Sequence, residues 1–437
     1  MKAISNDKPQ GVCATDFASI IGEENAVCLW ENIEIDQQKR IQQAVTSGKP
    51  PTCIVYPRTQ QQLAAVIAKA HSHNWRVLPC GSGSKLSWGG LVKGVDVVVS
   101  TERINQLIEH AVGDLTVTVE AGMKFSDLQA LLAKSRQFLA LDPTAPESAT
   151  IGGIVATGDT GSLRQRYGSV RDQLLGVTFV RADGEIAKAG GRVVKNVAGY
   201  DLMKLLTGSY GTLGLISQLT FRVYPLSEAS GTVVLTGSAE AVSQATDILR
   251  GSALTPVQAD LLSTKLVSSL GLGQGLGLIA RFQSISESVK EQSNRVLEVG
   301  QKLGLDGAIF ADADEASLWQ RLQERIHFSA TESVITCKIG VLPTAAVEIL
   351  TQVGLGLIHI SSGLGLLQLE DKNQVLKVRD FTQLNRGFLT ILEAPVAVKE
   401  QIDVWGYTGN ALPLMRRIKE QFDSKNILSP GRFVGGI

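Results

Sequence analysis

The chain has 437 residues, 44% of them hydrophobic, and its 42 Lys and Arg residues balance 42 Asp and Glu residues. A chain of this length and composition can bury two substantial cores, so we expect a globular protein with two domains. The zero formal net charge argues against nucleic acid or an anionic membrane surface as the principal partner, so any phosphate recognition must be local.

The cysteines and the N-terminus bear on the cellular setting. The five cysteines are scattered and form no CxxC pair, so the sequence specifies neither a disulfide framework nor an iron–sulfur or zinc site. The first residues, MKAISNDKPQ, lack the apolar run of a signal peptide, and no apolar stretch is long enough to span a bilayer. We therefore expect a cytoplasmic protein, with membrane contact only peripheral, through a partner at the inner face of a membrane.

The first part of the chain predicts a βαβ unit after a lead-in segment. Residues 1–46 show no pattern strong enough for a domain, and we expect one or two helices there. The segment CIVYP then predicts a strand. Thr59 is expected to cap the helix QQQLAAVIAKAHSHN, and RVLPC is expected to form a second strand. The sheet continues with the predicted strands VDVVVS and LTVTVEAG, followed by the helix SDLQALLAKS with Ser126 as its cap.

The later part of the chain predicts a second domain. LLGVTFVRADGEI predicts a hairpin with its turn at Asp183 and Gly184, and the strand GLISQLTFRVYP stops at Pro225, the expected domain boundary. Beyond it, apolar strands such as TVVLTG, GLGLIARF and VITCKIGV alternate with helices. This alternation predicts an antiparallel sheet with helices on one face, in two related halves. A last helix, ALPLMRRIKEQFDSK, leads to NILSPGRF, which we expect to fold back onto the first domain.

Two glycine-rich regions indicate that the backbone approaches a ligand closely. In PCGSGSKLSWGG (79–90), Gly81 and Gly83 allow neighbouring N–H groups to converge, while Ser82, Ser84 and Ser87 offer hydroxyls and Lys85 a charge. Taken alone, this loop fits a Gly/Ser-rich connector equally well, and it is neither a Walker loop nor GxGxxG. The second region (141–214) contains TIGGIVATGDTG, which has too few large side chains for ordinary core. Two separated cradles suit an extended, phosphate-containing ligand.

Several motifs in fixed order resemble the FAD-binding domain of the vanillyl-alcohol oxidase and p-cresol methylhydroxylase flavoproteins. They run from VYPRTQQQLAAVIAKA through PCGSGSKLSWGG, TVEAG, LDPTAPESATIGG, RYGSVRDQLLGVTFVRADGEI and LTGSYGTLGLISQLTFRVYP to SPGRF. Within that family, KNVAGYDLMKLLTGSYGTLG is most similar to the α-hydroxy-acid dehydrogenases, in particular the FAD-binding second subunit of glycolate oxidase, or glycolate dehydrogenase.

The resemblance implies a fold and a division into domains. The implied fold class is α+β, with a two-part FAD-binding domain of the vanillyl-alcohol oxidase type and an α+β, ferredoxin-like cap domain. The expected ranges are a lead-in segment (1–46), the FAD-binding domain (47–226), the cap domain (227–411), and a C-terminal helix and tail that return to the FAD-binding domain (412–437).

The resemblance also implies FAD as the cofactor. The first loop would hold its diphosphate, TIGG and the residues around Thr157 would lie against the flavin, and Ile216 would add backbone contacts. Ser84 stands where some relatives carry a histidine that bonds covalently to FAD, so non-covalent binding is expected. The expected cofactor-binding residues are Pro79, Gly81, Ser82, Gly83, Ser84, Lys85, Pro143, Thr144, Thr150, Gly152, Gly153, Thr157, Gly158 and Ile216.

Oxidation of an α-hydroxy acid on a flavin requires a base for the hydroxyl proton and a cation for the carboxylate. Of the five histidines, only His327 and His359 fall in the expected cap domain. His359 begins HISSGLGL, where metal-dependent relatives carry HxGDGNxH, but Leu366 stands at the second ligand position, so we expect no metal. His359 is a candidate catalytic base, while a lone histidine in an apolar strand is also typical of a hydrogen-bonded structural residue.

The cation for the carboxylate is the second catalytic candidate. Lys338, in VITCKIGVLP, is placed by the resemblance in a strand that reaches toward the flavin, although an alternating strand also presents basic residues to solvent. The resemblance further assigns Asn196, Tyr200 and Asp201 to a loop that is ordered beside the flavin.

Three hypotheses about function follow. The leading one is an FAD-binding subunit of a glycolate or other 2-hydroxy-acid dehydrogenase complex, working beside a catalytic flavoprotein subunit and an iron–sulfur subunit, because this chain has no cysteine cluster to relay single electrons. The second is a self-sufficient FAD-dependent 2-hydroxy-acid dehydrogenase whose base is His327, His359 or Tyr200. The third is a structural subunit with a vestigial FAD site.

Overall fold

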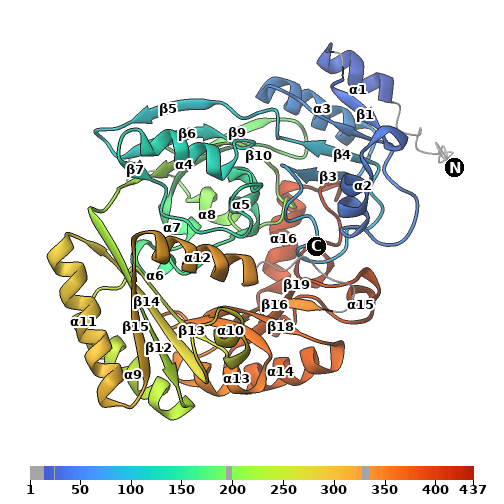
Figure 1. The fold of residues 1–437 in the computed structure, drawn as a ribbon. Helices are drawn as coiled ribbons and strands as arrows, with labels where there is room; N and C mark the ends of the chain where they lie inside the picture. The colour runs from blue at the N-terminus through green and yellow to red at the C-terminus, as the bar shows by residue number, and fades with distance from the viewer. Residues whose placement is uncertain (1–13, 24, 193–198, 327–333) are drawn as a thin grey trace, which may run out of the picture.

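The protein is described by a computed structural model of residues 14–23, 25–192, 199–326 and 334–437. Its strands form sheets of four, five and eight strands, and a short two-stranded pair (Figure 1). The eight-stranded sheet lies below the other two in Figure 1, and the C-terminal helix lies beside the first part of the chain. The mixture of helices with mainly antiparallel sheets confirms the predicted α+β class.

The four-stranded sheet contains the predicted βαβ unit. Its order is β1-β2-β4-β3, in which β2 and β3 both pair parallel to β4 and β1 adds an antiparallel edge. Thr59 caps the connecting helix as predicted, because its Oγ1 accepts a hydrogen bond from the backbone N–H of Gln62 (3.1 Å). The elements are α1 (Ala14–Ile21), β1 (Val27–Leu29), α2 (Ile35–Gln42), β2 (Cys53–Val55), α3 (Gln60–Ser72), β3 (Val77–Cys80) and β4 (Val97–Ser100).

The five-stranded sheet is antiparallel throughout, in the order β5-β6-β10-β8-β9. Helices α4, α5 and α8 bury their apolar residues against it. The predicted hairpin turns at Gly184, whose φ of 90° favours glycine, but α4 begins after Lys124, so the predicted cap at Ser126 is wrong. The strands are β5 (Leu107–Ala111), β6 (Thr116–Glu120), β8 (Leu174–Val180), β9 (Ile186–Gly190) and β10 (Leu215–Arg222), and the helices are α4 (Phe125–Ala133), α5 (Ile151–Thr157), α6 (Arg164–Tyr167), α7 (Val170–Gln173) and α8 (Leu202–Leu206); β7 (Gln137–Phe138) pairs with β11 (Tyr224–Pro225).

The eight-stranded sheet is also antiparallel, in the order β15-β12-β14-β13-β17-β18-β16-β19. Its strands are β12 (Ala229–Gly237), β13 (Gln258–Leu262), β14 (Leu276–Ser284), β15 (Asp306–Ala311), β16 (Ile335–Gly340), β17 (Leu355–His359), β18 (Leu364–Leu369) and β19 (Phe388–Glu393). The helices around it are α9 (Ala239–Gly251), α10 (Thr264–Ser269), α11 (Ser286–Lys302), α12 (Asp312–Ile326), α13 (Ala346–Gln352), α14 (Lys372–Leu384) and α15 (Val396–Gln401).

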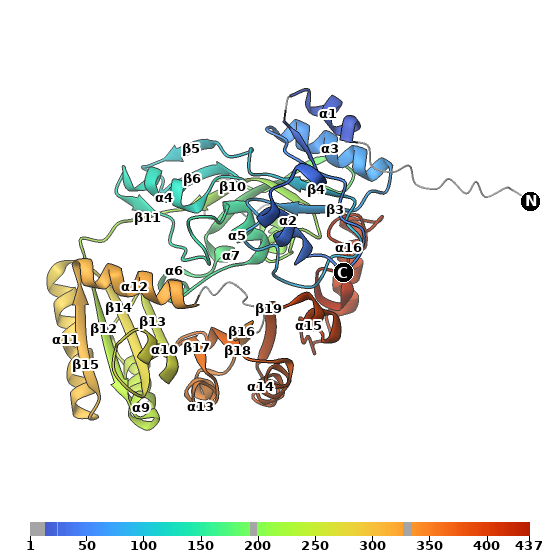
Figure 2. The ribbon, with the colours of Figure 1, turned by 45° about the vertical axis from the view of Figure 1, so that its right-hand side comes forward.

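Helices cover this sheet on both faces, in different amounts. One face packs on α9, α11, α13 and α14, which form the largest apolar core of the described chain. On the other face, α10 and α12 bury Leu266 and Leu318 against Ile279 and Leu357 in a smaller cluster. The prediction of helices on one face only is therefore wrong. The uncovered remainder of this second face is turned toward the first half of the chain (Figure 2).

The C-terminal segment lies against the first part of the chain. After α16 (Leu412–Phe422), the backbone N–H of Ser429 donates to Val77 O (2.9 Å), and Leu428 forms an isolated parallel bridge with Val77. The Nζ of Lys419, on α16, donates to Asp423 Oδ2 (2.6 Å) and to two main-chain carbonyls, and both side chains are at least 92% buried. The same carboxylate accepts the backbone N–H groups of residues 427 and 428.

Among the residues that the structure describes, no helix is both long enough and apolar enough to cross a bilayer.

Asp423→Ala is expected to lower the free energy of unfolding by about 3–5 kcal/mol, because it leaves the Lys419 ammonium buried without its counter-charge. Urea denaturation followed by circular dichroism measures this loss. The matched control is Glu420→Ala, which removes an exposed carboxylate from the same helix and is expected to change the free energy by less than about 0.5 kcal/mol. Equal effects of the two variants would contradict a stabilising role for the buried pair.

Candidate functional site

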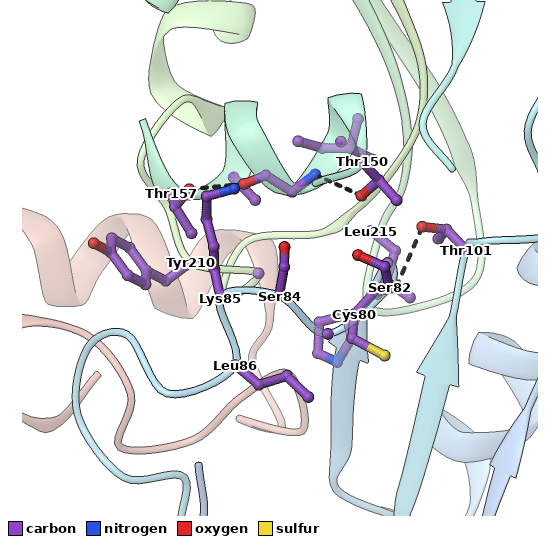
Figure 3. A pocket seen from close by; sticks show the side chains of 18 of the residues that line it. Cys80, Ser82, Ser84, Lys85, Leu86, Thr101, Thr150, Thr157, Tyr210 and Leu215 are labelled. Carbon is purple, nitrogen blue, oxygen red and sulfur yellow. Dashed lines mark hydrogen bonds between the residues drawn. The ribbon is translucent and has the colours of Figure 1, made fainter. Parts of the chain in front are cut away.

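The first glycine-rich loop and the second region meet around one cavity of about 680 Å³. The loop after β3 forms one wall, helix α5 forms another, and the segment 210–216 closes a third side (Figure 3). Of the residues expected to bind a cofactor, the following line this cavity: Pro79, Gly81, Ser82, Gly83, Ser84, Lys85, Thr150, Gly152, Gly153, Thr157 and Ile216.

The loop presents a row of free backbone donors. Within the described ranges, the N–H groups of Ser82, Gly83, Ser84 and Lys85 make no hydrogen bond to protein. Consecutive unpaired N–H groups in a turn form a concave site for an anion. The hydroxyls contribute less than predicted, because Ser82 Oγ donates to Ser148 O and Ser87 Oγ donates to Glu393 Oε1 (3.1 Å).

Glycine is required at position 81 because the loop passes very close to helix α5. A Cβ atom at Gly81 would lie 2.1 Å from Thr150 Oγ1, well inside any real contact. Thr150 is itself fixed, since its Oγ1 caps α5 by accepting the backbone N–H of Gly153 (3.3 Å). The two glycine-rich regions are therefore held together at the floor of the cavity.

Lys85 has a different role from the one predicted. Its Nζ lies 3.2 Å from Asp159 Oδ2, and both side chains are more than 90% buried. Figure 3 shows the Lys85 side chain rising from the loop toward α5. Asp159 is in turn held by the backbone N–H (2.8 Å) and the hydroxyl (3.1 Å) of Thr144. Lys85 is thus already neutralised by protein and does not offer an unpaired charge to a phosphate.

A second cavity, of about 1050 Å³, begins on the other side of this ion pair. Lys85 lines the first cavity and Asp159 lines the second, so the pair stands at the boundary between the two. The second cavity lies over the uncovered face of the eight-stranded sheet. Thr144, expected in the cofactor site, lines this cavity instead. Neither Pro143 nor Gly158 lines the first cavity; Gly158 ends α5 with a φ of 61°.

His359 lies in the second cavity with a carboxylate partner. The antiparallel register of β13 and β17 places Asp260 directly opposite His359, and His359 Nδ1 lies 2.6 Å from Asp260 Oδ1. Ser162 Oγ also donates to Asp260 Oδ1 (2.9 Å), which orients the carboxylate. With Nδ1 engaged in this hydrogen bond, the remaining ring nitrogen, Nε2, is available to a ligand in the cavity.

The charges around His359 set its protonation. Burial lowers the pKa of His359. The charge and hydrogen bond of Asp260, together with the charge of Asp142, raise it by more than burial lowers it, so the net pKa of His359 lies above the ordinary value. Burial raises the pKa of Asp142 itself to about 7. Asp142 also holds the neighbouring loop, because it accepts the backbone N–H groups of Gly161 (3.0 Å) and Leu163 (2.9 Å).

Two cationic side chains line the same cavity. Lys338, on β16, pairs in register with Leu366 on β18, and burial lowers the pKa of its ammonium. Arg281, on β14, was not identified from the sequence. Its Nε donates to buried Glu315 (3.1 Å) and its Nη1 to Gln258 (3.3 Å), while its Nη2 makes no hydrogen bond in the described part of the chain.

Several sequence candidates lie elsewhere. Tyr200 is 88% exposed and Asp201 pairs with Lys204, and neither lines either cavity. Asn196 and His327 fall outside the described residues. Among the residues that are described, no cluster of three or more His, Cys, Asp or Glu side chains is arranged to hold a metal ion.

Comparisons with known proteins bear on the first cavity and on the whole fold. Residues 51–190 match the family described as "FAD binding domain". The chain is 27% identical to "Probable D-lactate dehydrogenase, mitochondrial" of Danio rerio, over 96% of this chain and 90% of that protein. It is 26% identical to "Glycolate oxidase subunit GlcD" of Bacillus subtilis (strain 168), over 68% of this chain and 64% of that protein.

Solved structures share the fold at lower identity. The structure of p-cresol methylhydroxylase with substrate bound aligns with a TM-score of 0.72 and 16% identity, covering 96% of this chain and 95% of that one. A structure of alkyldihydroxyacetonephosphate synthase aligns with a TM-score of 0.71 and 17% identity, covering 98% and 87% respectively. The free N–H groups of residues 82–85 and the close approach of Gly81 to helix α5 fit the diphosphate of a dinucleotide such as FAD.

Gly81→Ala is expected to weaken FAD binding by about 10- to 100-fold, since a new Cβ against Thr150 costs about 1–3 kcal/mol in a closely packed site. Quenching of FAD fluorescence on titration with apoprotein measures the affinity. The control is Gly113→Ala, where a Cβ meets no atom within 4 Å. An unchanged affinity of the Gly81 variant would contradict the proposed position of FAD.

Proposed function

We propose that this chain, which has the fold of p-cresol methylhydroxylase, is an FAD-dependent oxidoreductase that oxidises a small 2-hydroxy acid in the second cavity. The observation that carries this proposal is the His359–Asp260 pair, buried in a cavity that begins where the cofactor cavity ends. Two cationic side chains in the same cavity suit the carboxylate of such a substrate. The names of curated relatives, among them D-lactate dehydrogenase and a glycolate oxidase subunit, support this substrate class.

Different residues of the second cavity bind the substrate and accept its proton. Lys338, which has no ion pair among the described residues, binds the carboxylate and so orients the hydroxyl-bearing carbon. Arg281, whose charge Glu315 balances, adds a hydrogen bond from its free Nη2. His359 Nε2 takes the hydroxyl proton, and Asp260 holds the ring and stabilises the imidazolium that forms. Bound FAD supplies the two-electron acceptor for the hydrogen on the carbon that carries the hydroxyl. The product is the 2-oxo acid, and the proton remains on His359 until it is released to solvent.

The described residues do not provide an internal route for single electrons. No cysteine cluster exists in the sequence, so reduced cofactor must pass its electrons to an external acceptor. We therefore keep, as a second candidate, a subunit of a glycolate oxidase-type complex that includes a further flavoprotein subunit and an iron–sulfur subunit. Its support is the similarity to the GlcD subunit. In that case the isolated chain would bind FAD but would not reduce it with a hydroxy acid.

His359→Gln is expected to slow reduction of the bound flavin by about 10²- to 10⁴-fold, because the variant loses the base for the hydroxyl proton. Anaerobic stopped-flow absorbance with glycolate, lactate and 2-hydroxyglutarate measures the rate in the isolated chain. His71→Gln is the control, since His71 lies on α3 and lines neither cavity. A His359 variant as fast as the wild type would refute the assignment, while a wild type that no hydroxy acid reduces would favour the multi-subunit candidate.

Asp260→Asn is expected to shift the acidic limb of the rate profile to lower pH. His359 acts as a base only when neutral, so the rate rises with pH through its pKa, which Asp260 holds above the ordinary value. Without that charge the pKa falls, and we expect the limb to move down by about 1–3 pH units. The measurement is the flavin reduction rate between pH 5 and 10, roughly spanning the titration of histidine. Asp314→Asn, on exposed α12 surface, is the control, and an unmoved limb would exclude His359 as the titrating base.

A further inference from the structure

Arg432, near the end of the chain, is a buried cation without an acidic partner. Its side chain lines the first cavity, and the residue is only 4% exposed. Its Nη2 donates to the carbonyls of Lys85 (3.2 Å) and Leu86 (2.8 Å). Its Nε and Nη1 are buried and have no hydrogen-bond partner, and no carboxylate of the described chain lies within ion-pair distance of it.

The other buried cations of the described structure differ from Arg432. Lys85 and Lys419 each pair with a carboxylate at 3.2 Å or less. Arg379 has only main-chain carbonyl partners, but in the described structure none of its guanidinium nitrogens is both buried and unpartnered, whereas two of Arg432 are. Lys399 has only main-chain carbonyl partners, but burial lowers its pKa to about 7, so it can lose its proton. Arg432 does not lose its proton in this way. Burial lowers the pKa of Arg432 only to about 10, so the guanidinium keeps its charge at neutral pH. A buried guanidinium with two unpartnered donors favours an anion from outside the protein.

The position of Arg432 indicates which anion. The main chain of Arg432 is fixed against the glycine-rich loop at residues 79–90, here called the cofactor loop. Arg432 O accepts the backbone N–H of Gly90 (2.9 Å) and the indole N–H of Trp405 (3.1 Å). The guanidinium and the free N–H groups of residues 82–85 thus belong to the same cavity. In oxidised FAD, the diphosphate is the one anionic group. A guanidinium suits it, since the unpartnered Nε–H and Nη1–H groups can each donate a charge-assisted hydrogen bond to a phosphate oxygen.

We propose that Arg432 binds the diphosphate of FAD, so that the C-terminal segment supplies the counter-charge of a cofactor site whose remaining contacts come from residues 79–216. Lys85, the basic residue inside the glycine loop, is committed to Asp159 and does not serve this purpose. The proposal concerns binding of the cofactor and does not depend on which substrate is oxidised.

The test compares three ligands on the apoprotein: FAD, ADP and riboflavin, of which only the first two carry a diphosphate. Arg432→Gln is expected to weaken binding of FAD and ADP by about 10- to 100-fold, as for loss of charge-assisted hydrogen bonds, and to leave the affinity for riboflavin within about twofold. Isothermal titration calorimetry measures all three affinities. Arg417→Gln is the matched control, because it removes the same charge from an exposed position on α16.

The results that overturn the proposal are distinct from those that support it. An equal loss for FAD, ADP and riboflavin would show that Arg432 only shapes the loop through the carbonyls of residues 85 and 86. Unchanged FAD affinity with an altered KM for a hydroxy acid would assign Arg432 to the substrate. If Arg432→Gln does not fold, Arg432→Lys decides. It keeps the charge but loses the Nε–H and Nη1–H donors, so the affinity for ADP should weaken several-fold while that for riboflavin does not. No change in the affinity for ADP would refute the proposal.

Discussion

The buried ion pair of Lys419 and Asp423 fixes the C-terminal segment to the first part of the chain, and the cofactor cavity depends on that closure. Asp423 accepts the backbone N–H groups of residues 427 and 428 as well as the ammonium of Lys419. This directs the next residues alongside β3, where Ser429 and Leu428 pair with Val77. The loop that follows β3 is the cofactor loop, so the pair acts on the cofactor cavity through one strand and a few main-chain hydrogen bonds.

Polar side chains on one face of an otherwise apolar sheet define the second cavity. Such groups are costly to bury unless each has a partner, and here the partners come from neighbouring strands. Arg281 and Gln258 face each other on β14 and β13, as Asp260 and His359 do on β13 and β17. Strand register therefore determines the geometry of the histidine and of the charge that orients it. A shift of one residue would turn the whole set into the apolar core on the other face.

The sequence predicted the cofactor region better than the cavity beside it, and the reason is physical. The contacts of Gly81, Gly152 and Thr150 follow from local backbone requirements, which leave a visible glycine pattern. Asp260 leaves none, because QADLL is a short apolar strand and its histidine partner is 99 residues away along the chain. Helices α10 and α12 were also missed, and with them the partial cover on the second face of the sheet. Lys85 was assigned to phosphate because its neutralising carboxylate, Asp159, could not be identified without the fold.

The return of residues 427–433 to the strand and loop at residues 77–90 has a consequence for synthesis on the ribosome. These partners are separated by most of the length of the chain, so their contacts close a very long loop and cannot form before residues 427–433 have been synthesised. A nascent chain can complete the five-stranded sheet while it is still attached, but it lacks the segment that holds the carbonyls of the cofactor loop. A chain that stops before residue 427, however well folded in its first half, therefore lacks the main-chain contacts that hold this loop in place.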